Sequence, residues 1–274
     1  MEERYRQERE IAVRLAHFAG QSSAYTQGAG GNVSVKTDDG NMIIKASGLR
    51  LRDLSLNDGL ACVNLSPILQ ALSEENMSST VFSDTIRSSQ MEFCGKMQKP
   101  SVETGFHALF GKYVIHHHSV YANFVCCCRK AAEMAKKLFP QARIIPFCMP
   151  GLELCLAIRK SLSERPLSED RPEIFFFANH GLAVSCNNEQ VLLDTVAQVN
   201  DRIMETFSLA DFELRDISEQ AAIPYFDRHI TLDQHLYCNG NPEVKDDTMR
   251  EILSAAMWLD ESYRQKGLFP DYLR

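Results

Sequence analysis

The stretch from Pro100 to Ser119, PSVETGFHALFGKYVIHHHS, is the most informative part of this 274-residue chain. It places Glu103 on an expected helix and then runs into a β-branched strand that ends in three consecutive histidines. Because successive side chains of a strand point to opposite faces, His116 and His118 share one face and His117 points to the other. His116 and His118 can therefore bind one metal ion together.

A third histidine, His180, stands in the sequence NHG at residues 179–181, after a second expected strand. Three histidine nitrogens that leave one coordination position open are typical of a catalytic zinc site rather than a structural one. A histidine-rich strand end alone is also compatible with ordinary polar surface. The presence of Glu103 and of the NHG sequence favours a metal site, with His116, His118 and His180 as its ligands.

Composition and charge restrict the class of protein. The hydrophobic share of 45% and the charged share of 24% are ordinary for a globular chain with a full core. The formal net charge of −7 argues against nucleic acid as a partner, because nucleic-acid binding requires a basic face. No apolar run reaches the length of a membrane span, and the N-terminal MEERYRQERE is too charged for a signal peptide. We therefore expect a cytoplasmic protein without a membrane partner.

The nine cysteines do not predict disulfide bonds. Cys126, Cys127 and Cys128 are consecutive within an expected helix, and the others are scattered among apolar neighbours. No CxxC pair occurs, so neither a thiolate zinc site nor a dithiol redox site is indicated. We expect reduced cysteines that pack as small hydrophobic residues.

Strand patterns alternate with helical patterns, which indicates a layered α/β domain. The expected strands are a hairpin within residues 32–47 that turns at Asp38-Asp39-Gly40, followed by Ala61–Leu65, Tyr113–His116, Arg143–Pro146, Ile174–Phe177 and Leu182–Cys186. The expected helices are Arg4–Ala19, one that Ser66-Pro67 opens, one that runs from Ser101 to near Gly111, Val120–Phe139 with a break near Arg129, Pro150–Leu162, Glu189–Leu209 and Asp246–Tyr263.

The polar stretch Glu74–Ser89 is expected to be a surface loop with part of a helix. Residues 1–214 are expected to form one domain, and residues 215–274 a C-terminal extension packed on it. The glycine-rich residues Gly28–Gly31 suit close approach of backbone N–H groups to an anion, and Ser101 at a helix start favours negative charge. A plain flexible turn at Gly28–Gly31 is the alternative.

Six pieces of sequence together resemble the class II aldolase/adducin family, which includes the L-fuculose-phosphate and L-rhamnulose-phosphate aldolases. They are GAGGNVSVK (Gly28–Lys36), IKASG (Ile44–Gly48), PSVE (Pro100–Glu103), VIHHHS (Val114–Ser119), PG (Pro150-Gly151) and ANHGLAV (Ala178–Val184). The resemblance covers roughly Glu8 to Asp211. It implies a three-layer α/β/α fold around a mixed, largely antiparallel sheet. It also implies a homo-oligomer, expected to be a tetramer, with the active site at a subunit boundary.

By position, the resemblance implies that His116, His118 and His180 bind zinc or another divalent metal, and that Glu103 is the catalytic acid/base. It further implies four residues that bind the substrate phosphate: Asn32, Ser47, Gly48 and Ser101. The expected function is a lyase that cleaves a phosphorylated ketose by a retro-aldol reaction through a metal-stabilised enediolate. The small-molecule partner is therefore a sugar phosphate.

Two other functions stay open. A sugar-phosphate epimerase, dehydratase or decarboxylase would use the same enediolate on the same scaffold. The epimerases considered place Asp at the base position, which favours an aldolase here. A non-catalytic scaffold like adducin would lack the metal ligands, whereas all three histidines are present in this chain.

The chain departs from the family pattern in several places. Val102 replaces a second serine of fuculose-phosphate aldolase, and His117 is bulkier than the residue often found between the two histidines. Glu153 lies one position away from an acidic residue of rhamnulose-phosphate aldolase, and a solvated helix residue is its alternative reading. TLDQHLYCNG (Thr231–Gly240) loosely resembles the extension of longer aldolase–dehydrogenase fusions, although no dinucleotide glycine motif accompanies it.

Four other polar positions are given structural roles. His107 is expected to pack or to orient the site rather than to bind metal, and His17 and His229 are expected at the surface. The Arg50–Arg52 pair is expected in a solvated turn, with contact to an anionic substrate as the alternative.

Overall fold

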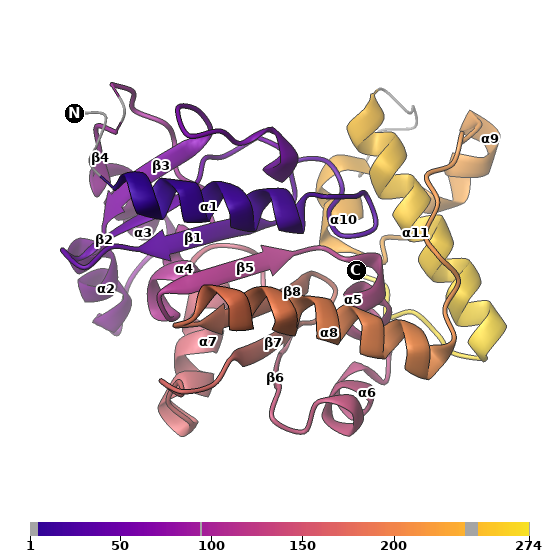
Figure 1. Cartoon of the computed structure of the whole chain (residues 1–274). Coiled ribbons are helices and arrows are strands. Elements are labelled where there is room, and N and C mark those ends of the chain that lie inside the picture. Colours follow the sequence, from indigo (N-terminus) through magenta and orange to yellow (C-terminus); the bar gives the residue numbers. More distant parts are fainter. Residues whose placement is uncertain (1–4, 94, 239–245, 274) are drawn as a thin grey trace.

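The computed structural model describes residues 5–93, 95–238 and 246–273. At its centre is an eight-stranded sheet of order β4-β3-β2-β1-β5-β8-β7-β6 (Figure 1). β6 and β7 pair in parallel, and the other neighbours are antiparallel. The strands are β1 (Asn32–Lys36), β2 (Asn41–Lys45), β3 (Leu60–Asn64), β4 (Gln90–Met91), β5 (Tyr113–His117), β6 (Arg143–Ile145), β7 (Glu173–Phe177) and β8 (Gly181–Cys186). The expected α/β fold with a mixed, largely antiparallel sheet is confirmed.

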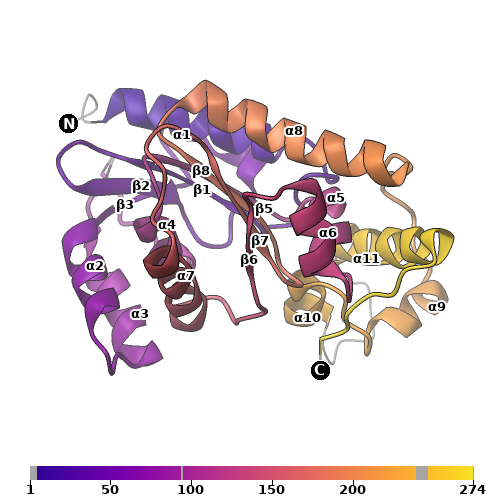
Figure 2. The same cartoon turned by 90° about the horizontal axis from the view of Figure 1, so that it is seen from below.

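Helices cover both faces of the sheet. They are α1 (Arg6–Ala19), α2 (Leu65–Ser73), α3 (Ser79–Ser88), α4 (Thr104–Leu109), α5 (Val120–Cys126), α6 (Ala131–Leu138), α7 (Leu152–Glu164), α8 (Glu189–Phe207), α9 (Glu219–Ala222), α10 (Leu232–Cys238) and α11 (Asp247–Lys266). Figure 2 shows α1 and α8 on one side of the sheet and α2, α3, α4 and α7 on the other.

The alternation of β5 places its histidines. Val114 packs in the core beneath α2, α4 and α7, whereas Ile115 packs in the core beneath α1 and α8. Because side chains alternate along a strand, His116 lies on the face of Val114, and His117 lies on the face of Ile115. His117 accordingly stacks on Tyr25, with ring centroids 5.5 Å apart.

Several element boundaries follow local chemistry that the hydrophobic pattern does not specify. The expected break near Arg129 is present, because α5 ends at Cys126 and α6 begins at Ala131. The prediction that Ser66 caps α2 is wrong. Asn64 is the cap, and its side chain accepts a hydrogen bond from the backbone N–H of Ser66. Asn is as good a cap as Ser, and the helix therefore begins two residues earlier than predicted.

The C-terminal segment, defined here as residues 215–238 and 246–273, packs against α5. The hydroxyl of Tyr263 donates to the backbone oxygens of Asn123 and Phe124, at 3.1 and 2.9 Å. Trp258 of α11 meets Tyr121 edge to face. Figure 1 shows α10 and α11 together at the end of the sheet where β5 and α5 meet. These contacts attach the segment to the same core as α1 and α8.

Two of the structural expectations for polar residues are wrong. His229 is buried, not exposed, because its imidazole Nε2 bonds to the backbone oxygen of Phe226 at 2.8 Å and its Nδ1 faces His235. Arg50 is no solvated residue, because it pairs with the buried Glu251 of α11 at 2.7 Å. The contacts of His229 lie within the C-terminal segment, and the ion pair of Arg50 reaches that segment from outside it. Local sequence patterns do not reveal either contact.

The remaining expectations for single residues are simpler. His17 and Glu153 are exposed, and His107 is buried with its Nδ1 bonded to the hydroxyl of Ser34 at 2.7 Å. The described cysteines are free, and all of them except Cys148 are buried. Within the part of the chain that the structure describes, none of the helices combines the length and apolarity required to cross a membrane.

Candidate metal centre

Glu103, His116, His118 and His180 meet at one buried point. Each offers a ligand atom, and these atoms all lie within 4.8 Å of one another. Glu103 is the N-cap residue directly before α4, His116 lies near the end of β5, and His180 lies in the turn between β7 and β8. The fold thus brings together the four residues predicted from sequence as metal ligands and acid/base; their roles stay predictions.

The ligand atoms converge at short distances. His116 Nε2 lies 3.0 Å from His118 Nε2. Glu103 Oε1 lies 3.1 Å from His116 Nε2 and 3.2 Å from His180 Nε2. Two nitrogen ligands at about 2.0–2.1 Å from a tetrahedral zinc ion would be about 3.3 Å apart, so the observed spacing is close to what zinc requires.

Hydrogen bonds made by the Nδ1 atoms of two imidazoles determine which ring nitrogen carries the proton. His116 Nδ1 faces the backbone oxygen of Leu182 at 3.0 Å, and His118 Nδ1 faces the Asp233 carboxylate at 2.5 Å. Both partners only accept, so each Nδ1 carries a proton. The Nε2 atoms of both rings face each other at 3.0 Å in the cluster, and they are the atoms that a metal ion would bind.

The charge state of the cluster also fits a metal. Burial alone would raise the pKa of the Glu103 carboxyl, but His116 and His180 lower this pKa well below its usual range by charge and hydrogen bonding. Burial lowers the pKa of His180 to about 4, although its hydrogen bond with Glu103 opposes this change. An ionised carboxylate beside a neutral imidazole is the protonation state that metal binding requires.

The sequence NHG has a structural reason at the site. Asn179 has a φ of 55°, a left-handed conformation that Asn tolerates better than most residues. A Cβ at Gly181 would lie 2.7 Å from the backbone oxygen of His117 and 3.1 Å from the His118 ring. Asn179 turns the chain so that His180 faces the cluster, and Gly181 lets β8 approach the histidine strand.

A cavity of about 190 Å³ opens onto the cluster. Its lining includes Glu103, His118 and His180 together with Ser47, Gly48 and Ser101, three of the four residues predicted to bind phosphate. The fourth, Asn32, does not line this cavity. It pairs with His116 across β1 and β5 and is fully buried, and its side-chain oxygen and nitrogen have no hydrogen-bond partner among the residues that the structure describes.

The glycine-rich residues do not all face the cavity. The backbone N–H of Gly28 donates to the Glu251 carboxylate at 2.7 Å, and Arg50 pairs with the same carboxylate. Gly28 thus donates to a side chain of α11 rather than to a substrate, and phosphate binding by this segment stays a prediction. Ala29, Gly30 and Gly31 remain in the cavity wall.

Two charged residues of the cavity wall were not identified as site residues from sequence, Lys45 and Asp233. Lys45 is 2% exposed, and its ammonium donates to the backbone oxygen of Ala29 at 3.1 Å. Burial lowers the pKa of Lys45 to about 8, while the charges of Glu103 and Asp233 oppose this change. The position of Lys45 after the apolar residues of its strand could have indicated a functional residue. The sequence around Asp233 gives no such indication.

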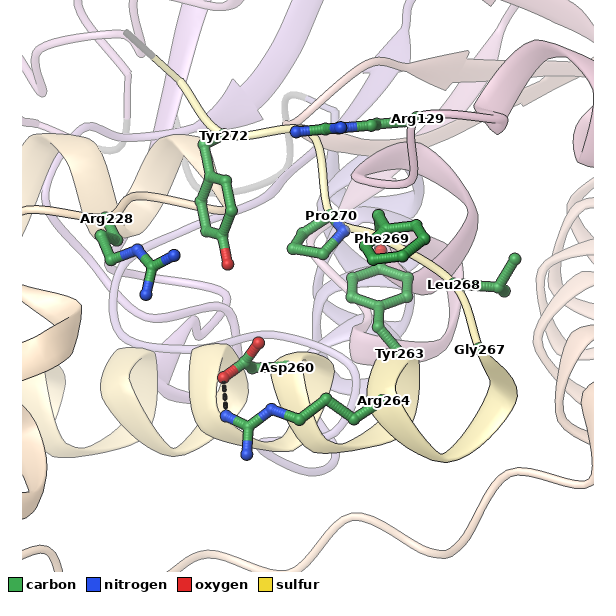
Figure 3. Close-up of a pocket in the computed structure, with 10 residues that line it drawn as sticks. All are labelled: Arg129, Arg228, Asp260, Tyr263, Arg264, Gly267, Leu268, Phe269, Pro270 and Tyr272. Carbon is green, nitrogen blue, oxygen red and sulfur yellow. Dashed lines mark hydrogen bonds and ion pairs between the residues drawn. The ribbon is translucent and has the colours of Figure 1, made fainter.

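A second, larger cavity of about 710 Å³ lies at the end of α11 (Figure 3). It is formed by α11, by the chain from Gly267 to Tyr272, and by Arg129 and Arg228. Arg264 pairs with Asp260 at its edge. None of its lining residues belongs to the histidine cluster, so this cavity is separate from the candidate metal centre.

Comparisons with solved structures agree with the fold. The chain is similar to the N-terminal class II aldolase domain of a conserved protein from Thermoplasma acidophilum (20% identity, TM-score 0.60, covering 71% of this chain and 91% of that one). It is also similar to an L-fuculose 1-phosphate aldolase (16% identity, TM-score 0.51, covering 92% of this chain and 96% of that one). A further similar structure is an aldolase II superfamily protein from Pseudomonas syringae (13% identity, TM-score 0.52, covering 97% of this chain and 96% of that one). At these identities the likeness shows the fold alone.

The family comparison is more specific. A comparison with curated proteins gave no match. The model of the class II aldolase and adducin N-terminal domain matches residues 10–190, which is more than half of the chain and contains the four residues of the cluster. This chain belongs to the class II aldolase/adducin family.

Proposed function

We propose that this protein is a metal-dependent lyase that cleaves a phosphorylated ketose by a retro-aldol reaction. The observation that carries the proposal is the convergence of three buried imidazoles and one carboxylate at a cavity in a class II aldolase fold. His116, His118 and His180 would hold a divalent ion, with zinc the best match to three nitrogen ligands. The bound ion would act as a Lewis acid on the oxygens of the substrate.

Glu103 is proposed to move the proton. Its low pKa keeps the carboxylate ionised, and its Oε1 lies at the cluster where a substrate carbon would be held. In the condensation direction Glu103 would remove a proton from that carbon. In the cleavage direction the carboxylate would first take up the proton that the substrate hydroxyl loses as the carbon–carbon bond breaks, and Glu103 would then give a proton to the carbanion.

Lys45 supports an anionic substrate. Its buried ammonium lines the same cavity as Ser47, Gly48 and Ser101, which offer hydroxyl and backbone donors. A charged donor and neutral donors in one small cavity are suited to a phosphate group. We propose that the phosphate of the substrate binds among these residues.

The family resemblance supports Asn32 as a further phosphate donor. Its buried side-chain amide has no partner among the described residues, but it does not line the cavity, so the chain around β1 must shift for Asn32 to reach the phosphate. We expect Asn32→Ala to raise KM for the phosphorylated substrate by roughly 10–100-fold, since a hydrogen bond to a charged group contributes about 1.5–3 kcal/mol. Steady-state kinetics with the phosphorylated and unphosphorylated ketose measure this effect. Ser34→Ala, on the same face of β1, is the matched control. An unchanged preference for the phosphorylated substrate in Asn32→Ala would contradict the role of Asn32.

The protein is proposed to be a homotetramer. Beside the histidine cavity lies a groove of about 660 Å³ with polar and apolar lining residues, and it shares Ser47, Ser101 and Val102 with that cavity. Val102 is 53% exposed and Met97 is 61% exposed, which suits a surface that another subunit covers. Light scattering is expected to give the mass of four 31.0 kDa chains, and Met97→Glu is expected to give a smaller species. A fully active monomer at assay concentration would refute the proposed assembly.

The lyase proposal is tested by screening phosphorylated ketoses for release of dihydroxyacetone phosphate. The protein should be made without a histidine tag and assayed after chelation and again after zinc is restored. Zinc-dependent release from at least one ketose is expected. An epimerase or dehydratase would convert the substrate without releasing dihydroxyacetone phosphate, and an adducin-like scaffold would bind no stoichiometric metal.

A further inference from the structure

We propose that Asp233 of α10 is a positioning residue of the metal centre, and that metal binding is thereby coupled to the docking of the C-terminal segment. The inference rests on the proposed metal site. The family match ends at residue 190, so this carboxylate comes from outside the part of the chain that carries the histidines. It reaches the centre from a helix 115 residues away in the sequence from His118.

The contact between Asp233 and His118 is buried and direct. Asp233 Oδ2 lies 2.5 Å from His118 Nδ1, and the two side chains are 8% and 5% exposed. The carboxylate accepts the proton of Nδ1, which leaves Nε2, 3.0 Å from His116 Nε2, as the nitrogen available to a metal ion. A carboxylate behind a metal-binding histidine orients the ring and raises its basicity as a ligand. Asp233 therefore holds His118 in the tautomer that a metal ion requires.

Gly30 provides the room for this contact. A Cβ at residue 30 would lie 2.7 Å from His118 Nδ1 and 3.1 Å from Asp233 Oδ2. Any larger residue would separate the imidazole from the carboxylate. One glycine of the GAGG segment is thus required by the His118–Asp233 pair, independently of any phosphate.

The turn that presents His180 also holds α10. The backbone oxygen of Asn179 accepts from the N–H of Leu232 at 2.7 Å, and its side-chain amide donates to the backbone oxygens of Ile230 and Asp271 at 2.9 and 2.5 Å. The left-handed Asn179, next to His180, is therefore bonded both to the start of α10 and to the chain that follows α11. Displacement of α10 would remove Asp233 from His118 and release the partners of Asn179.

A second attachment of the same segment does not touch the histidines. Glu251 of α11 is 3% exposed, accepts from Gly28 N–H, and pairs with Arg50. Glu251 fastens α11, and not α10, to the glycine-rich segment, so its neutralisation weakens that attachment but leaves the contacts of α10 with His118 and Asn179 in place. Glu251→Gln is therefore the matched control for Asp233→Asn.

Coupling follows from the arrangement. If the docking of α10 against His118 increases the affinity for the metal ion by some factor, then the bound ion must favour the docked position of α10 by the same factor, because linkage is reciprocal. Two measurements on tag-free protein test this: the zinc dissociation constant by chelator competition, and hydrogen exchange of residues 232–238 with and without zinc.

We expect Asp233→Asn to weaken zinc binding by about 10–100-fold and Glu251→Gln by less than about threefold. Zinc should slow exchange in α10 of the wild type and of Glu251→Gln, but not of Asp233→Asn. Zinc affinity within about threefold of the wild type in Asp233→Asn, or equal weakening in both variants, would overturn the role of Asp233. If Asp233→Asn does not fold, hydrogen exchange of the wild type tests the coupling, because unchanged exchange in α10 on zinc binding would contradict it.

A wild type that binds no zinc would refute the metal site itself. This result differs from one in which zinc binds but exchange in α10 does not change.

Discussion

Replacement of His118 by Ala is expected to abolish stoichiometric metal binding and activity together. His118 Nε2 is one of three imidazole nitrogens at the cluster, and a zinc ion with only two remaining protein nitrogens would lose its preferred coordination. Metal content per chain after gel filtration, measured beside turnover, tests this expectation. Full zinc occupancy in His118→Ala would contradict the ligand assignment.

His117→Ala is the matched control for this experiment. His117 adjoins both ligands in sequence but stacks on Tyr25 on the other face of β5, and burial lowers its pKa to about 3. Its removal should reduce stability through the lost packing and leave the metal in place. Loss of metal in both variants would indicate a damaged strand rather than a missing ligand.

Glu103→Gln is expected to lower kcat by about 10²–10⁴-fold while metal content survives. Glutamine keeps the shape and polarity of Glu103 but cannot transfer a proton, and the three histidines remain. Single-turnover kinetics on the substrate found by the ketose screen, combined with metal analysis, measure the two effects separately. Near-normal turnover would contradict the proposed mechanism, and loss of the metal would instead make Glu103 a ligand.

The cluster of three histidines and one glutamate could be predicted because the sequence motifs that contain these residues are short and continuous. Strand alternation separates His116 and His118 from His117, and the family resemblance adds Glu103 and His180; the structure places these four ligand atoms within 4.8 Å of one another. Likewise, the alternation of strand and helix patterns predicted the layered fold, because hydrophobic periodicity reports which face of each element is buried.

The remainder of the site depends on long-range packing. Asp233 and Glu251 lie on helices whose positions relative to His118 and Gly28 are determined by tertiary contacts such as those of Asn179. A carboxylate in an amphipathic helix looks the same in sequence whether it faces solvent or a buried imidazole. The burial of Lys45 and His229 was hidden for the same reason. The position of Asn32 outside the cavity wall likewise required the observed pairing of β1 and β5.

The claim that this cluster is a metal centre is tested most directly by anomalous X-ray diffraction. Crystals of the tag-free protein grown with zinc should be measured on both sides of the zinc absorption edge. We predict one strong anomalous peak per chain, bounded by the Nε2 atoms of His116, His118 and His180. No peak at this point, with Glu103 still within hydrogen-bond distance of His116 and His180, would contradict the account.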